Sequence, residues 1–180
     1  MKKRLVLIEG ENVSIVAQDK DFGDAKNFVA SRPTGSKILD LIGANGNSYD
    51  TATVEKYMPE PSLEIGNKKI FTIIHNMDGH YLGDVRFVKV PDEDSVYEFG
   101  MVVTEPKHGY GTEALKLVSN YAFSELGAKR VCVRIYQINP ISFRFATKAG
   151  FKYEKTTNDG YTVDGTLYLE DWLYLDSPIK

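Results

Sequence analysis

The stretch that most constrains the fold of this 180-residue chain runs from Tyr97 to Leu117 and reads YEFGMVVTEPKHGYGTEALKL. Its first part has the pattern of a strand, its middle is a short polar loop that ends in Gly109-Tyr110-Gly111, and its last part has the pattern of a helix. Glycines at such a junction let the backbone approach a ligand, and the free N–H groups of the first helical turn point at it. Because the N-terminus of a helix carries partial positive charge, the pattern predicts an anion site, most often for phosphate.

The segments around this stretch predict an α+β fold. Short connections between three strands indicate an antiparallel meander, and the turn at Asn76–Gly79 has glycine where positive φ is needed. The strand–helix–strand unit that follows has the length of a right-handed crossover, which makes its two strands parallel. The turn signal Asp164-Gly165 then predicts a terminal hairpin. The expected strands are 69–75, 80–90, 96–103, 129–135, 151–162 and 166–175, and the expected helices are 109–126 and 140–149.

The N-terminal part is harder to interpret. We expect short strands at 5–8 and 13–16, a helix that is capped by Asp19 or Asp21 and continues to about Ala30, and a helix at 51–57. Residues 33–66 contain repeated glycines and prolines, among them Gly43 and Gly46. This segment either shapes the acceptor side of an enzyme or is a surface loop without a role. We interpret residues 1–180 as one domain.

Composition excludes several classes of protein. With 42% hydrophobic residues the chain can bury a substantial core, and a net charge of −3 without a basic run argues against a nucleic-acid partner. No apolar run approaches the length of about 20 residues that a membrane span needs, so we expect a cytoplasmic protein with no membrane partner. The one cysteine, Cys132, lies in an apolar run and is expected to be a buried, unreactive thiol. His75 and His80 flank a hairpin without a third ligand, so no metal site is predicted.

Two known phosphate-binding patterns have to be weighed for the glycine loop. Residues 109–114 match G-x-G-x-x-A, but the loop follows a meander, and 135–138 offer no acidic residue for a ribose hydroxyl. Only one βαβ unit is expected, where a dinucleotide-binding fold needs several. No Gly-Lys-Ser/Thr follows the glycines, which argues against a P-loop.

Residues 97–151 resemble the GCN5-related N-acetyltransferase (GNAT) family. The resemblance rests on EFGMVV, HGYGTEAL, the second parallel strand and NPISFRFATKAGF, in this order. Ser142 and Arg144 are similar to the subgroup that acetylates ribosomal protein N-termini, whereas the EFG strand and the VDG hairpin also resemble polyamine acetyltransferases. The family implies a mixed, mostly antiparallel sheet with a central βαβ unit and two splayed parallel strands.

The resemblance also implies acetyl-CoA as cosubstrate. Backbone N–H groups of the loop would bind its pyrophosphate, the exposed backbone of the preceding strand would bind its pantetheine arm, and Asn139 would contact it or act only as a helix N-cap. Pro106 stands where the family usually has Gln or Arg. The implied pyrophosphate residues are His108, Gly109, Tyr110, Gly111 and Thr112, and the implied pantetheine residues are Met101, Val102 and Val103.

Two catalytic roles follow from the same resemblance. Glu98 occupies the position of a glutamate proposed as general base in relatives, although it could instead form an ion pair with Arg86 or Arg134. Many relatives have a tyrosine as general acid where this chain has Ala146. Ser142 is the substitute that we favour, with Tyr136 and Tyr110 as further candidates and a purely structural serine as the alternative.

The resemblance therefore implies an N-acetyltransferase that acts on a primary amine, either a small molecule or a protein N-terminus. The alternative is a protein that binds CoA or another metabolite on the same fold with little or no turnover. The terminal hairpin is a candidate homodimer surface, because its apolar residues exceed what an edge strand normally hides. These residues are Leu167, Leu169, Trp172, Leu173, Leu175 and two tyrosines.

Overall fold

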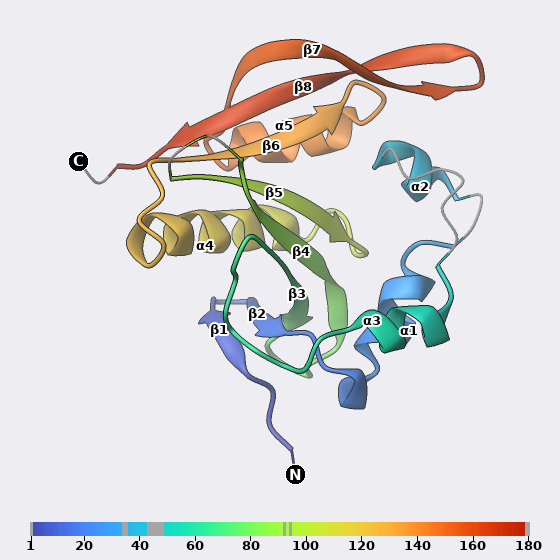
Figure 1. The fold of residues 1–180 in the computed structure, drawn as a ribbon, viewed down its shortest axis with the longest axis vertical. Coiled ribbons are helices and arrows are strands. Elements are labelled where there is room, and N and C mark those ends of the chain that lie inside the picture. The colour runs from blue at the N-terminus through green and yellow to red at the C-terminus, as the bar shows by residue number, and fades with distance from the viewer. Residues whose placement is uncertain (1, 34–35, 43–48, 92, 94, 179–180) are drawn as a thin grey trace.

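The computed structural model describes residues 2–33, 36–42, 49–91, 93 and 95–178. The strands are β1 Val6–Glu9, β2 Val13–Ala17, β3 Lys68–His75, β4 Tyr81–Lys89, β5 Val96–Val103, β6 Arg130–Tyr136, β7 Lys152–Val163 and β8 Thr166–Asp176 (Figure 1). The helices are α1 Asp24–Ala30, α2 Lys37–Leu41, α3 Thr51–Tyr57, α4 Tyr110–Ser124 and α5 Pro140–Lys148, with a 3₁₀ turn, η1, at Lys20–Phe22.

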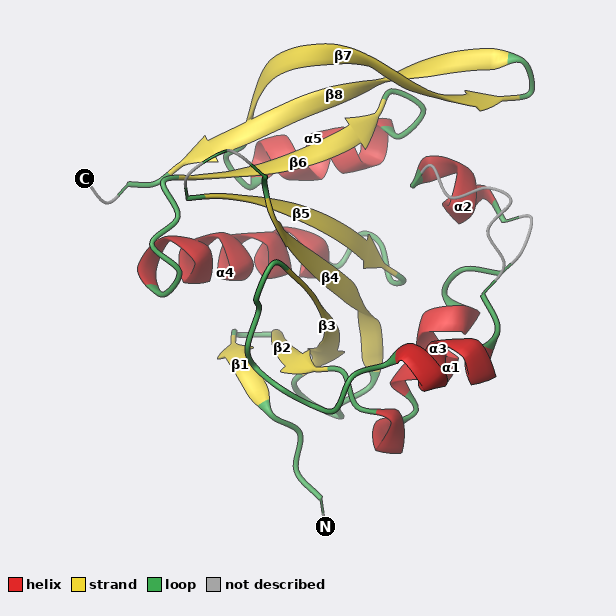
Figure 2. Cartoon of the chain, viewed as in Figure 1, coloured by secondary structure: helices red, strands yellow, loops and turns green. Residues whose placement is uncertain are grey.

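The strands form one eight-stranded sheet in the order β1-β2-β3-β4-β5-β6-β8-β7. Every neighbouring pair is antiparallel except β5 and β6, which are parallel and connected through α4 (Figure 2). The predicted α+β fold with a central βαβ unit is therefore confirmed. The apolar face of α4 packs on the sheet through buried residues that include Leu115 and Val118, and α5 lies against α4 and β6.

The parallel pair is short, and the two strands separate beyond it. Residues Val96–Phe99 of β5 pair with Arg130–Val133 of β6, after which β5 pairs only with β4 and β6 pairs only with β8. Residues 100–103 thus have one edge of their backbone free of a strand partner. This is the splayed pair that the family resemblance implied.

The N-terminal helix differs from the prediction. Asp19 does act as a cap, since its side chain accepts a hydrogen bond from the backbone N–H of Asp21, but it caps η1. Gly23, at φ 74°, turns the chain before α1 begins at Asp24. The short helix α2 was not predicted, and Gly43, Gly46 and part of the predicted 91–94 turn lie outside the described residues.

The terminal hairpin formed as predicted, with Asp164 at φ 49° and Gly165 at φ 78° in its turn. Most of its apolar residues serve the core of the chain itself. Leu173 is fully buried, Leu175 packs against the main core, and Trp172 packs against a smaller cluster that contains Cys132. Leu167 is 59% exposed, so only part of the surface that suggested a homodimer is available to a partner.

Among the described residues, no helix combines the length and the apolar character that a membrane crossing requires. Cys132 is fully buried as expected, and burial raises the pKa of its thiol to about 12. Such a thiol stays protonated near neutral pH, which makes it a poor nucleophile.

Candidate active site

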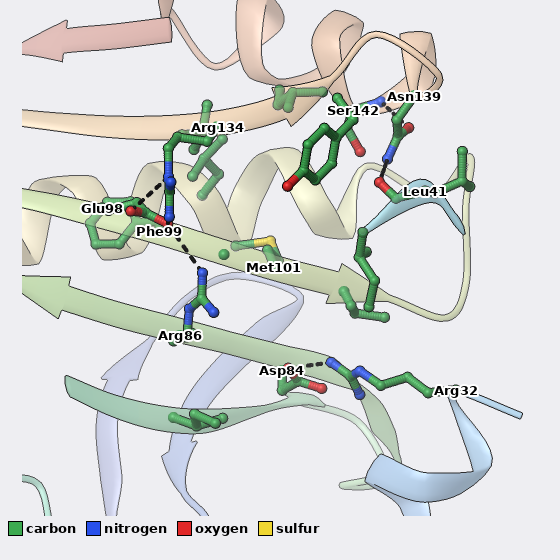
Figure 3. A pocket seen from close by; sticks show the side chains of 18 of the residues that line it. Arg32, Leu41, Asp84, Arg86, Glu98, Phe99, Met101, Arg134, Asn139 and Ser142 are labelled. Atoms are coloured by element: carbon green, nitrogen blue, oxygen red, sulfur yellow. Dashed lines mark hydrogen bonds and ion pairs between the residues drawn. The ribbon is translucent and has the colours of Figure 1, made fainter. Parts of the chain in front are cut away.

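A cleft of about 380 Å³ opens where β5 and β6 separate (Figure 3). Its walls come from both strands, from β4, from α4 and α5, and from the N-terminal helices. The lining includes Phe28, Arg32, Leu41, Ile42, Tyr49, Lys68, Ile70, Asp84, Arg86, Glu98, Phe99, Gly100, Met101, Val102, Leu115, Val133, Arg134, Ile135, Tyr136, Asn139, Ser142 and Phe145. Glu98, Met101, Val102, Asn139 and Ser142 were predicted as site residues, and the structure brings them together.

The predicted phosphate loop lies beside this cleft at the N-terminus of α4. Gly109 caps the helix at φ 85°, and Lys107 also has positive φ, 77°. A Cβ built on Gly111 would lie 3.5 Å from Cγ2 of Val103, so the loop meets the end of β5. The loop residues 108–112 do not line the cleft, but Leu115, one turn further along α4, does. The two predicted halves of a CoA site are therefore neighbours in space.

Glu98 is buried, with 7% exposure, and its carboxylate is paired with two arginines. Oε1 lies 3.1 Å from Nη2 of Arg86, and Oε2 lies 2.9 Å from Nε of Arg134. Figure 3 shows the two guanidinium groups reaching Glu98 from the strands on either side. The attraction of two cations offsets the cost of burying the carboxylate. Both ion pairs that were alternatives to a catalytic role are present.

Gly100 makes part of this arrangement possible. A Cβ at Gly100 would lie 3.1 Å from Nη2 and 3.3 Å from Cζ of Arg86. The absence of a side chain at this position lets the arginine lie across β5 toward Glu98. Arg134 continues the network on the other side, with Nη1 3.5 Å from Oε2 of Glu170. Glu170 is 4% exposed, and this burial raises the pKa of its carboxyl group.

At the other end of the view in Figure 3, Asn139 and Ser142 mark the start of α5. Oδ1 of Asn139 accepts a hydrogen bond from the backbone N–H of Ser142 at 3.0 Å, and its Nδ2 donates to the carbonyl of Leu41 at 3.3 Å. The N-cap role of Asn139 is confirmed. Met101 lies between this end and Glu98, so a base at Glu98 and an acid at Ser142 would act on different sides of the cleft.

One ion pair of the cleft escaped the sequence analysis, and one residue was named there only as a further candidate. Nη2 of Arg32 and Oδ1 of Asp84 form an ion pair of 2.7 Å in which both side chains are almost fully buried, and Tyr81 donates to Oδ2 of Asp84 at 2.8 Å. Tyr136, which had no positional argument, lines the cleft, and burial raises the pKa of its hydroxyl. The signal available for Tyr136 was its position at the end of the second parallel strand.

The charges of the cleft are unequal. Its described lining contains four cationic side chains, Arg32, Lys68, Arg86 and Arg134, and two carboxylates, Asp84 and Glu98. Each carboxylate is paired with at least one arginine. The cleft therefore has an excess of positive charge, although the chain as a whole has a net charge of −3.

Comparison with known proteins identifies the family. A family model described as "Acetyltransferase (GNAT) domain" matches residues 18–152. An "N-acetyltransferase 9-like protein" of Caenorhabditis briggsae is 31% identical over 129 residues, and the match covers 64% of this chain and 64% of the relative, less than two thirds of its length.

Solved structures share the fold. A GNAT-family acetyltransferase from Bacillus anthracis superposes with a TM-score of 0.76 at 21% identity, covering 94% of this chain and 98% of that one. Spermidine N-acetyltransferase from Vibrio cholerae, solved in complex with CoA and spermine, gives 0.75 at 13% identity, covering 93% and 97%. With the splayed strands, the glycine loop and a family model that matches most of the sequence, the chain belongs to the GNAT acetyltransferase family.

Proposed function

We propose that this protein transfers the acetyl group of acetyl-CoA to a primary amine. The observation that carries the proposal is the meeting of two ligand-accessible backbone segments, the edge of β5 at 100–103 and the N-terminus of α4. The first would extend the sheet with the amide-bearing pantetheine arm, and the second would bind the pyrophosphate. The proposed cofactor contacts are Met101, Val102, Val103, residues 108–112 and Asn139.

The reaction needs two proton transfers. The acceptor must be a neutral amine, whose nitrogen attacks the thioester carbon; the C–S bond then breaks, and the departing thiolate takes up a proton. Glu98 is the proposed base, and it acts through a water because both of its oxygens are held by arginines. Ser142 is the proposed hydrogen-bond donor to sulfur, and Tyr136 competes for this role because it lines the same cleft.

The charge of the cleft bears on the acceptor. A polycation such as spermine, which is present in the Vibrio cholerae complex, would enter a cleft where cationic side chains outnumber carboxylates by four to two. We expect a better acceptor to carry a carboxylate near its amine, as the N-terminus of a peptide with an acidic second residue does. A cytoplasmic location, a homodimer and the lack of a nucleic-acid partner remain sequence-based predictions.

Calorimetry and thiol release together test the proposal. Acetyl-CoA and CoA should both bind, and thiol release should depend on an added amine. The amines are spermidine and two peptides that differ only in Asp or Lys at the second position, with the Asp peptide expected to react fastest. Absence of binding at millimolar acetyl-CoA would rule out the function, and faster release with spermidine than with either peptide would rule out the acceptor assignment.

A second candidate function is CoA binding without turnover. It is favoured by Pro106 and Ala146, which replace residues that the family typically uses at the loop and as acid. Ala146 is fully buried in the core, and its methyl side chain has no proton to donate. Binding of CoA with no thiol release across the amine panel would support this function over transfer.

A further inference from the structure

A second group of reactive side chains closes the hairpin between β3 and β4, outside the cleft. His75 and His80 face each other across the turn, since the backbone N–H of His75 donates to the carbonyl of His80 at 3.0 Å. Their ring centroids are 5.0 Å apart. Asp78, in the turn between them, places Oδ1 3.1 Å from Nδ1 of His75 and 2.7 Å from Nδ1 of His80. Two imidazole nitrogens therefore converge on one carboxylate oxygen.

The sequence argument against a metal was that these two histidines have no third ligand. The structure supplies one, because the turn brings Asp78 between them. Within the described chain, the ligand atoms of His75, Asp78 and His80 all lie within 4.8 Å of one another. Bonds of about 2.0–2.2 Å put neighbouring ligands of a tetrahedral zinc ion roughly 3.3–3.6 Å apart. Small side-chain rotations would open the observed contacts to that spacing.

Glu105 determines which nitrogen of His80 is available. Its Oε1 lies 3.0 Å from Nε2 of His80. An ionised carboxylate only accepts hydrogen bonds, so Nε2 carries a proton toward Glu105. Nδ1 is then the nitrogen that would give up its proton and present a lone pair to an ion. Nδ1 is the atom that faces Asp78. A carboxylate that orients a ligating histidine through its other nitrogen is a recurrent feature of protein zinc sites.

The backbone and the neighbouring rings hold the group in place. Gly79, at φ 73°, donates its N–H to the carbonyl of His75 at 2.9 Å and closes the turn. Asn76 bonds the hairpin to the β1–β2 turn, with Nδ2 2.7 Å from the carbonyl of Gly10. The ring of His75 packs 5.4 Å from that of Tyr110, at the start of α4. The ligands thus need little ordering when an ion binds, which favours affinity.

We propose that His75, Asp78 and His80 bind a divalent transition-metal ion of the zinc type, with Glu105 as the residue that positions His80. Two imidazoles and one carboxylate suit zinc and its neighbours in the transition series, whereas magnesium and calcium prefer all-oxygen ligands. Three protein ligands leave a position of a tetrahedral ion for water. The site does not depend on acetyl transfer, and its ion would lie beside the predicted phosphate loop without forming part of the cleft.

Metal titration of the chelator-treated full chain tests the site. Co²⁺ should give the visible absorption of a tetrahedral complex with nitrogen and oxygen ligands, and one equivalent of Zn²⁺ should displace it. Zn²⁺ should also raise the midpoint of thermal unfolding, since it binds only the folded hairpin. A wild-type chain that shows no binding of either ion would overturn the proposal.

Variants locate the ion. His75→Gln, Asp78→Asn and His80→Gln should each abolish the cobalt spectrum, and Glu105→Gln should weaken Zn²⁺ binding by about 10- to 100-fold. His108→Gln, which removes the third histidine of the chain, is the matched control and should bind Zn²⁺ as wild type does. A cobalt spectrum retained in the His75→Gln/His80→Gln double variant would overturn the site. Unchanged affinity in Glu105→Gln would overturn the positioning role.

Discussion

The carboxylate of Glu113 accepts two hydrogen bonds from Asn12, one from the backbone N–H at 2.8 Å and one from the side-chain amide at 2.9 Å. Glu113 is in the first turn of α4, and Asn12 is in the turn between β1 and β2. The contact therefore fixes the helix end that forms the proposed phosphate site to the far edge of the sheet. Partial burial acts to raise the pKa of Glu113, but the hydrogen bonds from Asn12 and Val13 outweigh it and lower the pKa below its usual value.

We expect Glu113→Gln to cost about 1 kcal/mol of unfolding free energy at neutral pH, because the replacement cannot accept both bonds as an anion. A carboxyl group whose pKa is lower in the folded state stabilises the fold when the pH is above its pKa in the unfolded state. This contribution is lost as the pH falls through the pKa of the folded state. Urea unfolding should show a difference in unfolding free energy between wild type and Glu113→Gln at pH 7, and this difference should disappear in acid. Glu125→Gln, at the exposed end of the same helix, is the control, with an expected change within about 0.5 kcal/mol. Equal unfolding free energies for wild type and Glu113→Gln at pH 7 would contradict the argument.

Gly109 and Gly127 flank α4, and both have positive φ, 85° and 64°. A Cβ on either would meet nothing within 4 Å, so alanine at each site introduces backbone strain without a clash. Both substitutions should cost about 1–2 kcal/mol in urea unfolding. Only Gly109→Ala should also lower acetyl-CoA affinity, by roughly tenfold. The free energy lost with one charge-assisted hydrogen bond corresponds to a change in Kd of about that factor. Calorimetry that finds the same affinity for the two variants would remove the loop from the cofactor site.

Glu98→Gln should lower kcat while the Kd for acetyl-CoA changes little, since the side chain is proposed to act on the amine. The expected loss is about 100-fold or more, as is typical for removal of a general base. Arg134→Gln, which removes one of the two ion-pair partners, separates structure from catalysis: an equal rate loss in both variants would indicate that Glu98 has only a structural role.

Ser142→Ala and Tyr136→Phe compare the two proposed proton donors. Each removes one hydroxyl from the cleft wall and leaves the remaining side chain in place. The variant that lacks the donor should lower kcat by about 10²-fold, whereas the other should stay near the wild-type rate. Steady-state thiol release at saturating acetyl-CoA decides between them. Wild-type rates in both variants would mean that the thiolate takes its proton from water.

The sequence predicted those parts of the fold that depend on local signals. Turns form at Asp164-Gly165 and Gly79 because aspartate and glycine adopt positive φ at little cost in free energy. The helix α5 begins at Asn139-Pro140 because asparagine suits the N-cap and proline suits the first helical position. Gly23 was not recognised as a break between η1 and α1, because the apolar spacing around it fits one continuous helix. The helix α2 has five residues, too few to establish a periodic pattern.

The site was predicted less completely, because side-chain pairing depends on register. From the sequence, either Arg86 or Arg134 could form an ion pair with Glu98. The strand register places both arginines close enough to form one. Arg32 and Asp84 are 52 residues apart, and no local signal connects them. Asp78 was counted as a turn residue, and its contacts with the two histidines became evident only once the hairpin geometry was known.

The short pairing of β5 with β6 has a mechanical consequence. The sheet consists of two sub-sheets, β1 to β5 and β6 to β8, whose backbones are connected by four paired positions. The angle between the sub-sheets is therefore held by few backbone hydrogen bonds, and it sets the width of the cleft. A ligand bonded to β5 at 100–103 would fill the space between the two sub-sheets and so connect them beyond the four paired positions.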